Sequence, residues 1–486
     1  MNAPSYDLWC WLRRAASMSM RGSAGASPSR VAFSLRGRFW QWVVCSLALV
    51  GVFATHASAA DGWKAGLARA VITPERPMWL AGYGGRDHPA EGTEHDLWVK
   101  VLALEDAEGR LAVLITSDVL GYSRVMLQSI RAALAERSGL KPAEIMLTAS
   151  HTHSGPVVRD SLLDYYPLDD AQMALVESYS RLLERRIVDT VAKAIADLQP
   201  ATISATESEA TFAVNRRTNR EAEVAERLAA GEKMAGPVDH SIPMLLVRGA
   251  DDKLRAIVFG YACHNTTLAW YRWCGDYAGF AQLAIEKEHP GVQAMFYTGC
   301  GADQNPLPRR ELALCQKYGE QLAAGVEKGL KTDARRLDPR LKTAIGEVVL
   351  PFERVTTTEE IDRYKNAEGM RGRWAGRLAA RRAAGEKFAD SYPYTVQVWK
   401  LGDQLWISLA GEVVVDYAIR FRREFGPKTW VASYAHDLVA YIPSRRVWEE
   451  GGYEGGSLYE YGLPAERWGP NTEELIAAEV AKLVKE

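Results

Sequence analysis

The residues with the clearest chemical potential lie in MLTASHTHSGPVV (146–158), where His151 and His153 stand one residue apart at the end of an apolar run. Side chains two positions apart in a strand point to the same side, so both imidazoles would project together. Gly155 and Pro156 then begin a loop, which is where functional sites are often built. The spacing leaves three interpretations open: the pair binds a metal, binds a substrate, or closes a strand.

Histidine is scarce, with nine in 486 residues, yet His264 ends the apolar run IVFGYACHNTT in the same way as His151. Glu412 ends another such run, LWISLAGE. A core histidine satisfied by backbone and a plain acid at a helix N-terminus are the alternatives for these two. The loop-like stretch 434–457 adds Tyr441 and Tyr453, which would ordinarily be read as surface aromatics.

Strands must position these residues, and the pattern of apolar residues predicts such strands. Three segments read as hairpins whose second strand runs into a polar or ionisable residue: 100–118 before Asp118, 241–262 before His264, and 394–412 ending at Glu412. Their turns are expected at 107–109, 251–252 and 402–403. A short strand over 144–150 leads into His151, and helical periodicity marks 123–139, 170–197 and 471–485.

This mixture of strands and helices predicts an α/β fold of mixed α+β character. We expect mixed sheets with flanking helices in one large catalytic domain. Asp118 is expected to cap the following helix, and the Arg-rich segment 357–388 to be helical with a solvated face. The 59 basic and 61 acidic residues leave a net charge of −2, so the chain lacks the basic footprint of a nucleic-acid-binding protein.

The first sixty residues differ from the rest. Segment 11–38 is basic and free of acids, and an apolar stretch over 42–54 precedes the small-residue sequence THASAADG. This pattern predicts a secretory signal over 1–60, cleaved near Ala59 or Ala60, and a secreted or periplasmic hydrolase domain over 61–486. The apolar stretch is shorter than the roughly 20 residues of a membrane span, which favours a cleaved signal. An uncleaved membrane anchor is the alternative.

Export would permit disulfides among the four cysteines beyond the leader. Their spacing allows three pairings, and buried thiols are the alternative; none forms the paired CxxC of a structural zinc site. They are Cys263, Cys274, Cys300 and Cys315.

Five blocks stand in the order of the motifs of the neutral (alkaline, non-lysosomal) ceramidases: SHTHSGP, NRR (215–217), YACHNTT, LAGEVVVDYA and AYIPS with GGYEGGS. Twelve residues separate Tyr441 from Tyr453, as in that family. The chain therefore resembles the family over about residues 63–486. The resemblance implies that one zinc ion is held by His151, His264, Glu412 and Tyr441.

The remaining roles also follow from the resemblance. His153 would face the substrate as hydrogen-bond donor or proton shuttle, and Arg216 and Tyr453 would bind the scissile group and its developing oxyanion. Zinc brings the pKa of a bound water from 15.7 to about 7 and polarises a carbonyl. An imidazole with an ordinary pKa of about 6.5 is suited to deliver a proton to the leaving amine.

The implied activity is hydrolysis of an N-acyl amide bond, such as that of ceramide, to an amine and a fatty acid. The substrate would be a small lipid-like or N-acylated compound, with transient contact to a membrane surface. Two alternatives stand beside it: a zinc amidase or esterase acting on a non-sphingolipid acylated compound, and a non-catalytic protein that binds a ligand in the same pocket. Oligomeric state is left undetermined.

Two departures from the family pattern support these alternatives. In FYTGCGADQNPLPR (296–309), Gln304 stands where the family has a serine with a nucleophilic or essential role, and a carboxamide cannot be the nucleophile. Asp303 is then the nearest candidate base, and Gln304 or Asn305 could orient a substrate polar group, unless the segment is simply a turn. The family's larger members add a β-sandwich domain, whereas this sequence has one helix at its end.

Three further residues could support the ligands from behind. They are His95, Asp276 and His436.

Overall fold

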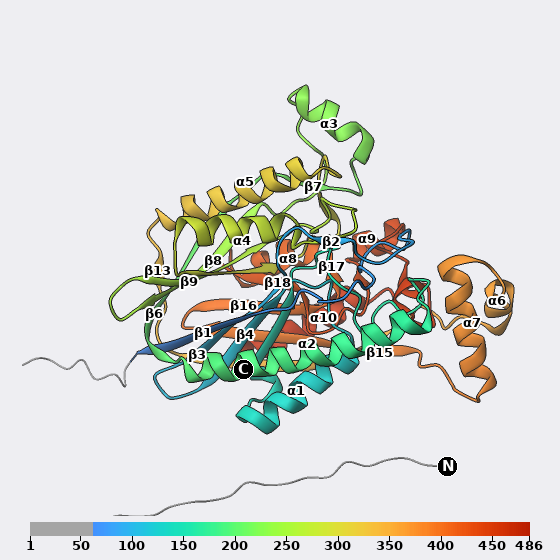
Figure 1. The fold of residues 1–486 in the computed structure, drawn as a ribbon, viewed down its shortest axis with the longest axis horizontal. Coiled ribbons are helices and arrows are strands. Elements are labelled where there is room, and N and C mark those ends of the chain that lie inside the picture. Colours follow the sequence, from blue (N-terminus) through green and yellow to red (C-terminus); the bar gives the residue numbers. More distant parts are fainter. Residues whose placement is uncertain (1–61) are drawn as a thin grey trace, which may run out of the picture. The chain divides into compact units, whose positions relative to one another are not determined.

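The computed structural model describes residues 62–486, so the predicted leader lies outside the described residues. A mixed sheet of thirteen strands organises this part of the chain (Figure 1). The strands run in the order β11-β9-β8-β6-β1-β3-β4-β5-β18-β16-β15-β14, with β13 paired to β6. Their bounds are β1 (Trp63–Val71), β3 (Trp98–Glu105), β4 (Leu111–Ser117), β5 (Ile145–Ala149), β6 (Gln199–Glu209), β8 (Ser241–Gly249), β9 (Leu254–Tyr261), β11 (Gln293–Thr298), β13 (Arg335–Arg336), β14 (Leu341–Pro351), β15 (Ser391–Leu401), β16 (Gln404–Ala410) and β18 (Trp430–Ala435).

Three short ladders lie outside this sheet and join distant loops. They pair β2 (Gly92–Thr93) with β10 (Arg272–Trp273), β7 (Ala213–Asn215) with β12 (Gln304–Pro306), and β17 (Glu412–Val413) with β19 (Tyr441–Ile442). The helices are α1 (Arg124–Ser138), α2 (Asp170–Ala196), α3 (Glu221–Ala229), α4 (Asp276–Glu288), α5 (Leu312–Leu330), α6 (Thr358–Tyr364), α7 (Gly369–Ala383), α8 (Asp416–Phe425), α9 (Arg445–Glu450) and α10 (Thr472–Lys485), with 3₁₀ turns η1 (Pro142–Glu144) and η2 (Leu458–Tyr461).

The predicted hairpins are confirmed. β3 and β4, β8 and β9, and β15 and β16 are antiparallel pairs joined at the expected turns. Parallel pairs also occur, namely β4 with β5, β9 with β11, and β16 with β18, so the sheet is mixed as the sequence indicates. The predicted mixed sheet with flanking helices is therefore observed.

The long sheet curls back on itself, because β11 at its end contacts β5 and β18 near its middle. The Thr298 hydroxyl of β11 donates to the carbonyls of Ala149 (3.2 Å) and Ser150 (2.9 Å) beyond the hydrogen-bonded ladder. An inner core fills the space between the two halves and includes Trp399, Trp406, Tyr297 and Met146. Helices cover the outer faces: α1 and α2 on one side and α4 and α5 on the other in Figure 1.

One local prediction was wrong. Asp118 does not cap a helix: its carboxylate accepts from the Trp98 N–H (3.0 Å), and Ser123 caps α1 instead. The Arg-rich segment is helical as predicted and forms two helices, α6 and α7, which extend at the right of Figure 1. Trp374 is fully buried in a small core between them, because the pair folds back on itself around Gly369, whose φ is +78°.

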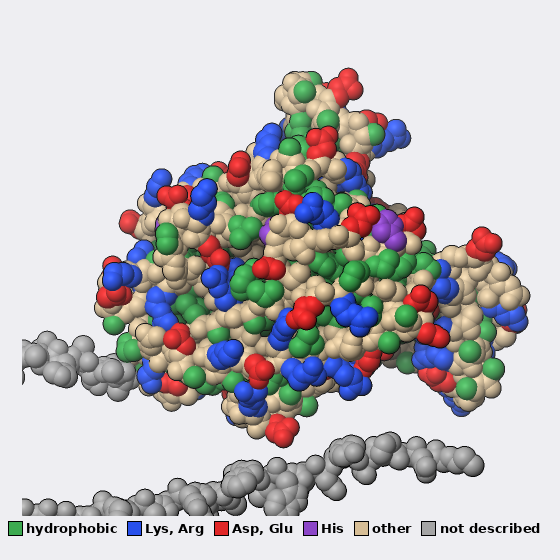
Figure 2. All heavy atoms as spheres, in the orientation of Figure 1, with side chains coloured by type: hydrophobic (Ala, Val, Ile, Leu, Met, Phe, Trp, Pro, Cys, Tyr) green, Lys and Arg blue, Asp and Glu red, His purple; other side chains and the backbone are tan. Residues whose placement is uncertain are grey.

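The four cysteines of the described residues are free and buried. They are therefore buried thiols, the second of the two alternatives, and form no disulfide in this part of the chain. Over the face seen in Figure 2, basic and acidic side chains are interspersed. No helix within residues 62–486 combines the length and apolarity that a membrane crossing needs.

Candidate metal centre

The candidate metal centre forms where strands of the curled sheet end. His151 follows β5 and His264 follows β9, and each of these strands has a parallel neighbour. Glu412 follows β16 and opens β17, where it is the register partner of Tyr441 in β19. Because the sheet curls, these carboxyl ends converge, and the crevice outside such ends is the usual binding place in sheets with parallel strands.

The four predicted zinc ligands lie together and are buried, with exposed fractions of 0–5%. The Glu412 Oε2 atom lies 3.3 Å from His151 Nε2 and 3.0 Å from His264 Nε2. The Tyr441 hydroxyl lies 3.4 Å from His264 Nε2. His153 adds a third imidazole, since its Nε2 lies 3.1 Å from that of His151.

The other ring nitrogens define the tautomers. His151 Nδ1 lies 2.7 Å from the Leu120 carbonyl, and His264 Nδ1 lies 2.8 Å from the Gly301 carbonyl. A carbonyl only accepts hydrogen bonds, so Nδ1 carries a proton in both rings and Nε2 is the atom directed to the centre. Histidines that bind metals are oriented by a backbone acceptor in this way.

Burial sets much of the protonation in this centre. It holds the pKa of Tyr441 well above its usual range, so a phenolate there requires a bound cation. Burial also lowers the pKa of His264 to about 4 and holds the pKa of His153 well below its usual range, which favours the neutral form of each ring. Burial alone would raise the pKa of Glu412, but His151 and His264 hold it well below its usual range. Neutral imidazoles beside a carboxylate are the donors that zinc prefers.

The spacing also fits a tetrahedral ion. Ligand bonds of roughly 2.0–2.2 Å put the ligand atoms of a tetrahedral site about 3.3–3.6 Å apart, and the separations around Glu412 and His264, at 3.0–3.4 Å, lie at or slightly below this range. Two donor sets share His151 and His264: one adds His153, and the predicted one adds Glu412 and Tyr441. His153 Nδ1 has no hydrogen-bond partner in the described part of the chain, so its ring lacks the anchor of the other two.

Neighbouring groups orient the predicted ligands. Tyr461 donates its phenol hydroxyl to Glu412 Oε1. Arg216 donates to the Tyr441 hydroxyl (3.0 Å), to Glu454 (2.7 Å) and to Asn305 Oδ1 (3.3 Å). The predicted substrate residues Arg216 and Asn305 therefore hold Tyr441 through one chain of hydrogen bonds.

Sequence reasoning missed Tyr461 and Glu454 as members of this centre. Both lie in YEGGSLYEYG (453–462), whose tyrosines and glutamates recur within a few residues of the predicted Tyr453. That local enrichment was the signal that could have identified them.

A small cavity of about 20 Å³ adjoins the centre. This is room for about one water or ion. Tyr453 is 46% exposed on one wall, and Gly82 on another approaches His153 so closely that an added Cβ would lie 2.3 Å from its Nδ1. The lining residues are Gly82, Leu120, His151, His153, Leu162, Tyr165, Glu412, Tyr441, Tyr453, Glu460 and Tyr461. A substrate acyl chain therefore requires the walls to open.

Helix α7 ties two of these walls together. Arg377 donates to the Asp164 carboxylate (2.9 Å) and to the Gly462 carbonyl (3.0 Å). Arg373 donates to the backbone carbonyls of Asp164 (2.9 Å) and Tyr165 (3.0 Å). These arginines thus bind the loops that carry Tyr165 and Tyr461, which explains why the segment is not simply solvated.

Asp303 and Gln304 do not line the cavity, and both side chains are fully buried. Asp303 accepts from Asn215 Nδ2 (3.1 Å) and the Val415 N–H (2.9 Å). The Gln304 amide donates to the Ala262 carbonyl (2.6 Å) and accepts from the Asp239 N–H (2.9 Å). Their polar atoms are engaged in holding loops around the centre.

The three predicted supporting residues form no hydrogen bond to a predicted zinc ligand. His95 Nε2 lies 3.3 Å from Cys274 Sγ, and His436 Nε2 lies 3.0 Å from Ser408 Oγ. Asp276 accepts from the N–H groups of Thr267 (3.1 Å) and Leu268 (2.9 Å), so it orders the loop after His264 rather than the ring itself.

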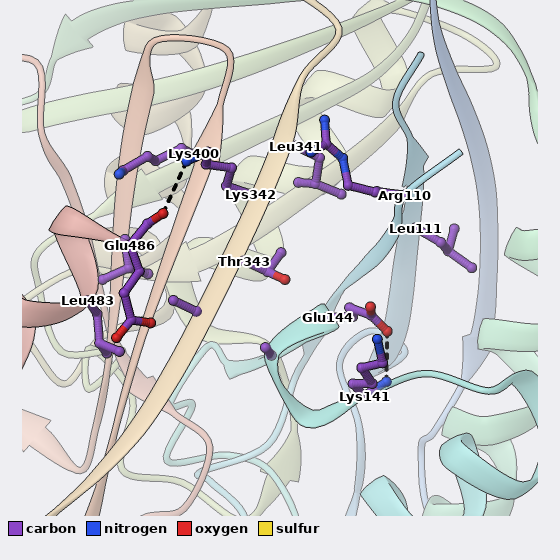
Figure 3. Close-up of a pocket in the computed structure, with 13 residues that line it drawn as sticks. Arg110, Leu111, Lys141, Glu144, Leu341, Lys342, Thr343, Lys400, Leu483 and Glu486 are labelled. Carbon is purple, nitrogen blue, oxygen red and sulfur yellow. Dashed lines mark hydrogen bonds between the residues drawn. The ribbon is translucent and has the colours of Figure 1, made fainter. Parts of the chain in front are cut away.

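A larger cavity of about 360 Å³ lies elsewhere, between the start of β4, η1, β14 and α10. Figure 3 shows its basic lining, including Arg110, Lys342 and Lys400. Lys342 donates to the Glu486 carbonyl (3.0 Å) and Lys400 to the Val484 carbonyl (2.5 Å). None of the predicted site residues lines this cavity.

Comparisons with known proteins show which family and which solved structures the chain is similar to. The profile of the family described as neutral/alkaline non-lysosomal ceramidase, N-terminal, matches residues 63–309. The crystal structure of neutral ceramidase from Pseudomonas aeruginosa is similar to this chain, with a TM-score of 0.66 and 18% identity over 87% of this chain and 74% of that one. A structure described as ceramidase complexed with C2 gives a TM-score of 0.66 and 17% identity, covering 87% and 76%. No curated protein sequence matches the chain.

Proposed function

Because this chain belongs to the neutral/alkaline non-lysosomal ceramidase family, we propose that it is a zinc-dependent hydrolase that cleaves the amide bond of a ceramide-like, N-acylated substrate. The observation that carries the proposal is the buried convergence of His151 Nε2, His264 Nε2 and Glu412 Oε2. Tyr441 completes a set of four ligands for one zinc ion per chain. Bound zinc supplies Lewis-acid polarisation of the scissile carbonyl and a water of lowered pKa.

The chain's own residues bind the substrate and move protons. His153 is neutral, because burial lowers its pKa, and it lies on the cavity wall beside His151. It therefore holds a substrate polar group and relays a proton to the leaving amine. The Arg216 guanidinium, fixed by Glu454 and donating to the Tyr441 hydroxyl, provides positive charge beside the developing oxyanion. Tyr453 places a phenol hydroxyl on the open wall beside the scissile group, and this hydroxyl donates to Glu460 (2.9 Å).

A second substrate class is supported by Gln304, which stands where the sequence resemblance places the family's serine. Its amide is engaged with the backbone of Ala262 and Asp239, so it offers no nucleophile. In this version the same centre hydrolyses an amide or ester of a non-sphingolipid acylated compound.

Export to the periplasm or the exterior, and transient contact with a membrane surface, are also part of the proposal. The leader pattern in residues 1–60 supports export. Leu163 and Met173, exposed by 41% and 42%, lie in and just beyond the loop that carries the cavity residue Tyr165, and they support contact with lipid. Such exposed apolar side chains beside a site favour an apolar surface.

Metal analysis combined with a substrate panel tests the proposal. The purified chain should contain one zinc, and it should hydrolyse fluorescent ceramide or a short N-acyl amide, with activity lost on chelation and restored by zinc. His151→Ala should remove both zinc and activity. Esters or non-lipid amides turned over far above ceramide would favour the second class. Stoichiometric metal without turnover would favour a binding protein, and an active metal-free chain would refute the zinc site.

A further inference from the structure

A second buried carboxylate, that of Glu460 in η2, lines the same cavity as the metal centre. Its residue is 8% exposed. Its two oxygens accept only phenol hydroxyls, from Tyr453 (2.9 Å) and Tyr459 (3.2 Å). Within residues 62–486 it forms no ion pair, and Arg371, the cation that acts on it through charge, is paired with Glu466.

The other buried acids around the cavity are compensated. Glu412 faces His151 and His264, and Glu454 pairs with Arg216 (2.7 Å) and Arg217 (2.5 Å). Buried carboxylates are almost always paired in this way, because burial without a partner costs free energy. Glu460 is therefore the uncompensated acid of the cavity wall.

The free acceptor positions of the Glu460 carboxylate define which substrate groups it could bind. An ionised carboxylate has about four acceptor positions, and the two phenols fill two of them. The remaining positions are available for a donor that enters the cavity. Burial raises the pKa of Glu460, which agrees with a carboxyl that lacks a strong partner. A hydroxyl or ammonium group satisfies such an oxygen, whereas another carboxylate is repelled by it.

We propose that Glu460 is a specificity-determining residue that accepts a hydrogen bond from a hydroxyl or ammonium group next to the scissile amide and rejects substrates with a carboxylate there. This inference rests on the proposed function. It selects N-acyl amino alcohols or N-acyl diamines over N-acyl amino acids. A purely structural role, in which Glu460 only orders the two tyrosines, is the competing explanation.

Two matched probes separate these roles: N-lauroylethanolamine and N-lauroylglycine, which share one acyl chain and differ in an alcohol or a carboxylate at the end. The ratio of kcat/KM for the two is measured with the zinc-loaded wild type, Glu460→Gln and Glu449→Gln. Glutamine keeps the size and one acceptor but removes the charge. Glu449→Gln removes an exposed carboxylate that pairs with Arg445 away from the cavity.

We expect the wild type to prefer the ethanolamide at least tenfold, and Glu460→Gln to reduce that preference about tenfold, mainly through KM of the glycine derivative. Glu449→Gln should keep the wild-type ratio. Equal losses for both probes in Glu460→Gln would show a structural role and overturn the proposal, as would a wild type that treats both alike.

Binding separates this inference from the proposed function. Calorimetric Kd values for the same two probes are measured with the zinc-loaded wild type and Glu460→Gln. If neither probe is hydrolysed, the proposed activity fails, yet a Kd preference for the ethanolamide that Glu460→Gln abolishes would still support Glu460 as the selective residue. Absence of binding by the wild type, or a preference that the variant retains, would overturn it.

Discussion

Tyr461→Phe tests whether the hydrogen bond to the metal-facing carboxylate prepares the centre for zinc. The phenol hydroxyl of Tyr461 donates to Glu412 Oε1, while Oε2 faces His151 and His264. Without this donor, the buried carboxylate is free to turn in the metal-free protein and must be turned back when zinc binds. A hydrogen bond to a charged group contributes about 1.5–3 kcal/mol, and part of this becomes a cost of binding.

The expected result is zinc affinity weakened about 10- to 100-fold, the range found when a group that orients a metal ligand is lost. The assay is competition with a chromophoric chelator near pH 7.5, which gives Kd directly and needs no substrate. Tyr459→Phe is the matched control, because it deletes the same hydroxyl from a tyrosine that donates to Glu460 instead.

Two results would refute this reasoning. If Tyr461→Phe binds zinc as tightly as the wild type, the donor does not prepare Glu412. If Tyr459→Phe weakens zinc binding to the same extent, the effect comes from general loosening of η2.

Three further predictions follow from the residues around the centre. Burial raises the pKa of Asp303 to about 6 from 3.8. Its contribution to stability is therefore fully present below about pH 4 and falls by about 3 kcal/mol as the pH rises through 6. Chemical denaturation across pH 4–7 should show this loss, and Asp303→Asn should make the free energy of unfolding less dependent on pH. Arg377→Ala should speed hydrogen exchange about tenfold in 158–166 and 457–463, since it removes a charged hydrogen bond. Arg381→Ala loses an exposed pair with Glu386 and should leave this exchange unchanged. Equal exchange in both variants would show that Arg377 does not hold the walls. Gln304→Ser should lower the free energy of unfolding by roughly 2–4 kcal/mol, because it leaves buried backbone groups unpaired. The variant should hydrolyse ceramide no faster than the wild type. A large gain in hydrolysis would show that only the serine was missing.

The elements that could be predicted from this sequence are those whose signals lie within a short stretch of residues. Apolar runs separated by turn residues defined the hairpins that lead to His264 and Glu412, and the expected turns lie between their strands. His151 and His153 project into one cavity because a strand end and a loop present them together. Local signals failed for Asp118, where a polar residue after a strand was read as a helix cap although its partner is the distant backbone of Trp98.

The sequence by itself determined which residue types stand at the ends of which strands, because side-chain periodicity records the buried face of each element. Only the tertiary structure decided that β5, β9 and β16 end at one place, which depends on the curl of a sheet that joins residues hundreds of positions apart. The same long-range packing turned Gln304 toward backbone, gave Glu412 the phenol of Tyr461 and left Glu460 without a cation. Such pairings have no local signature, since each depends on where distant loops meet.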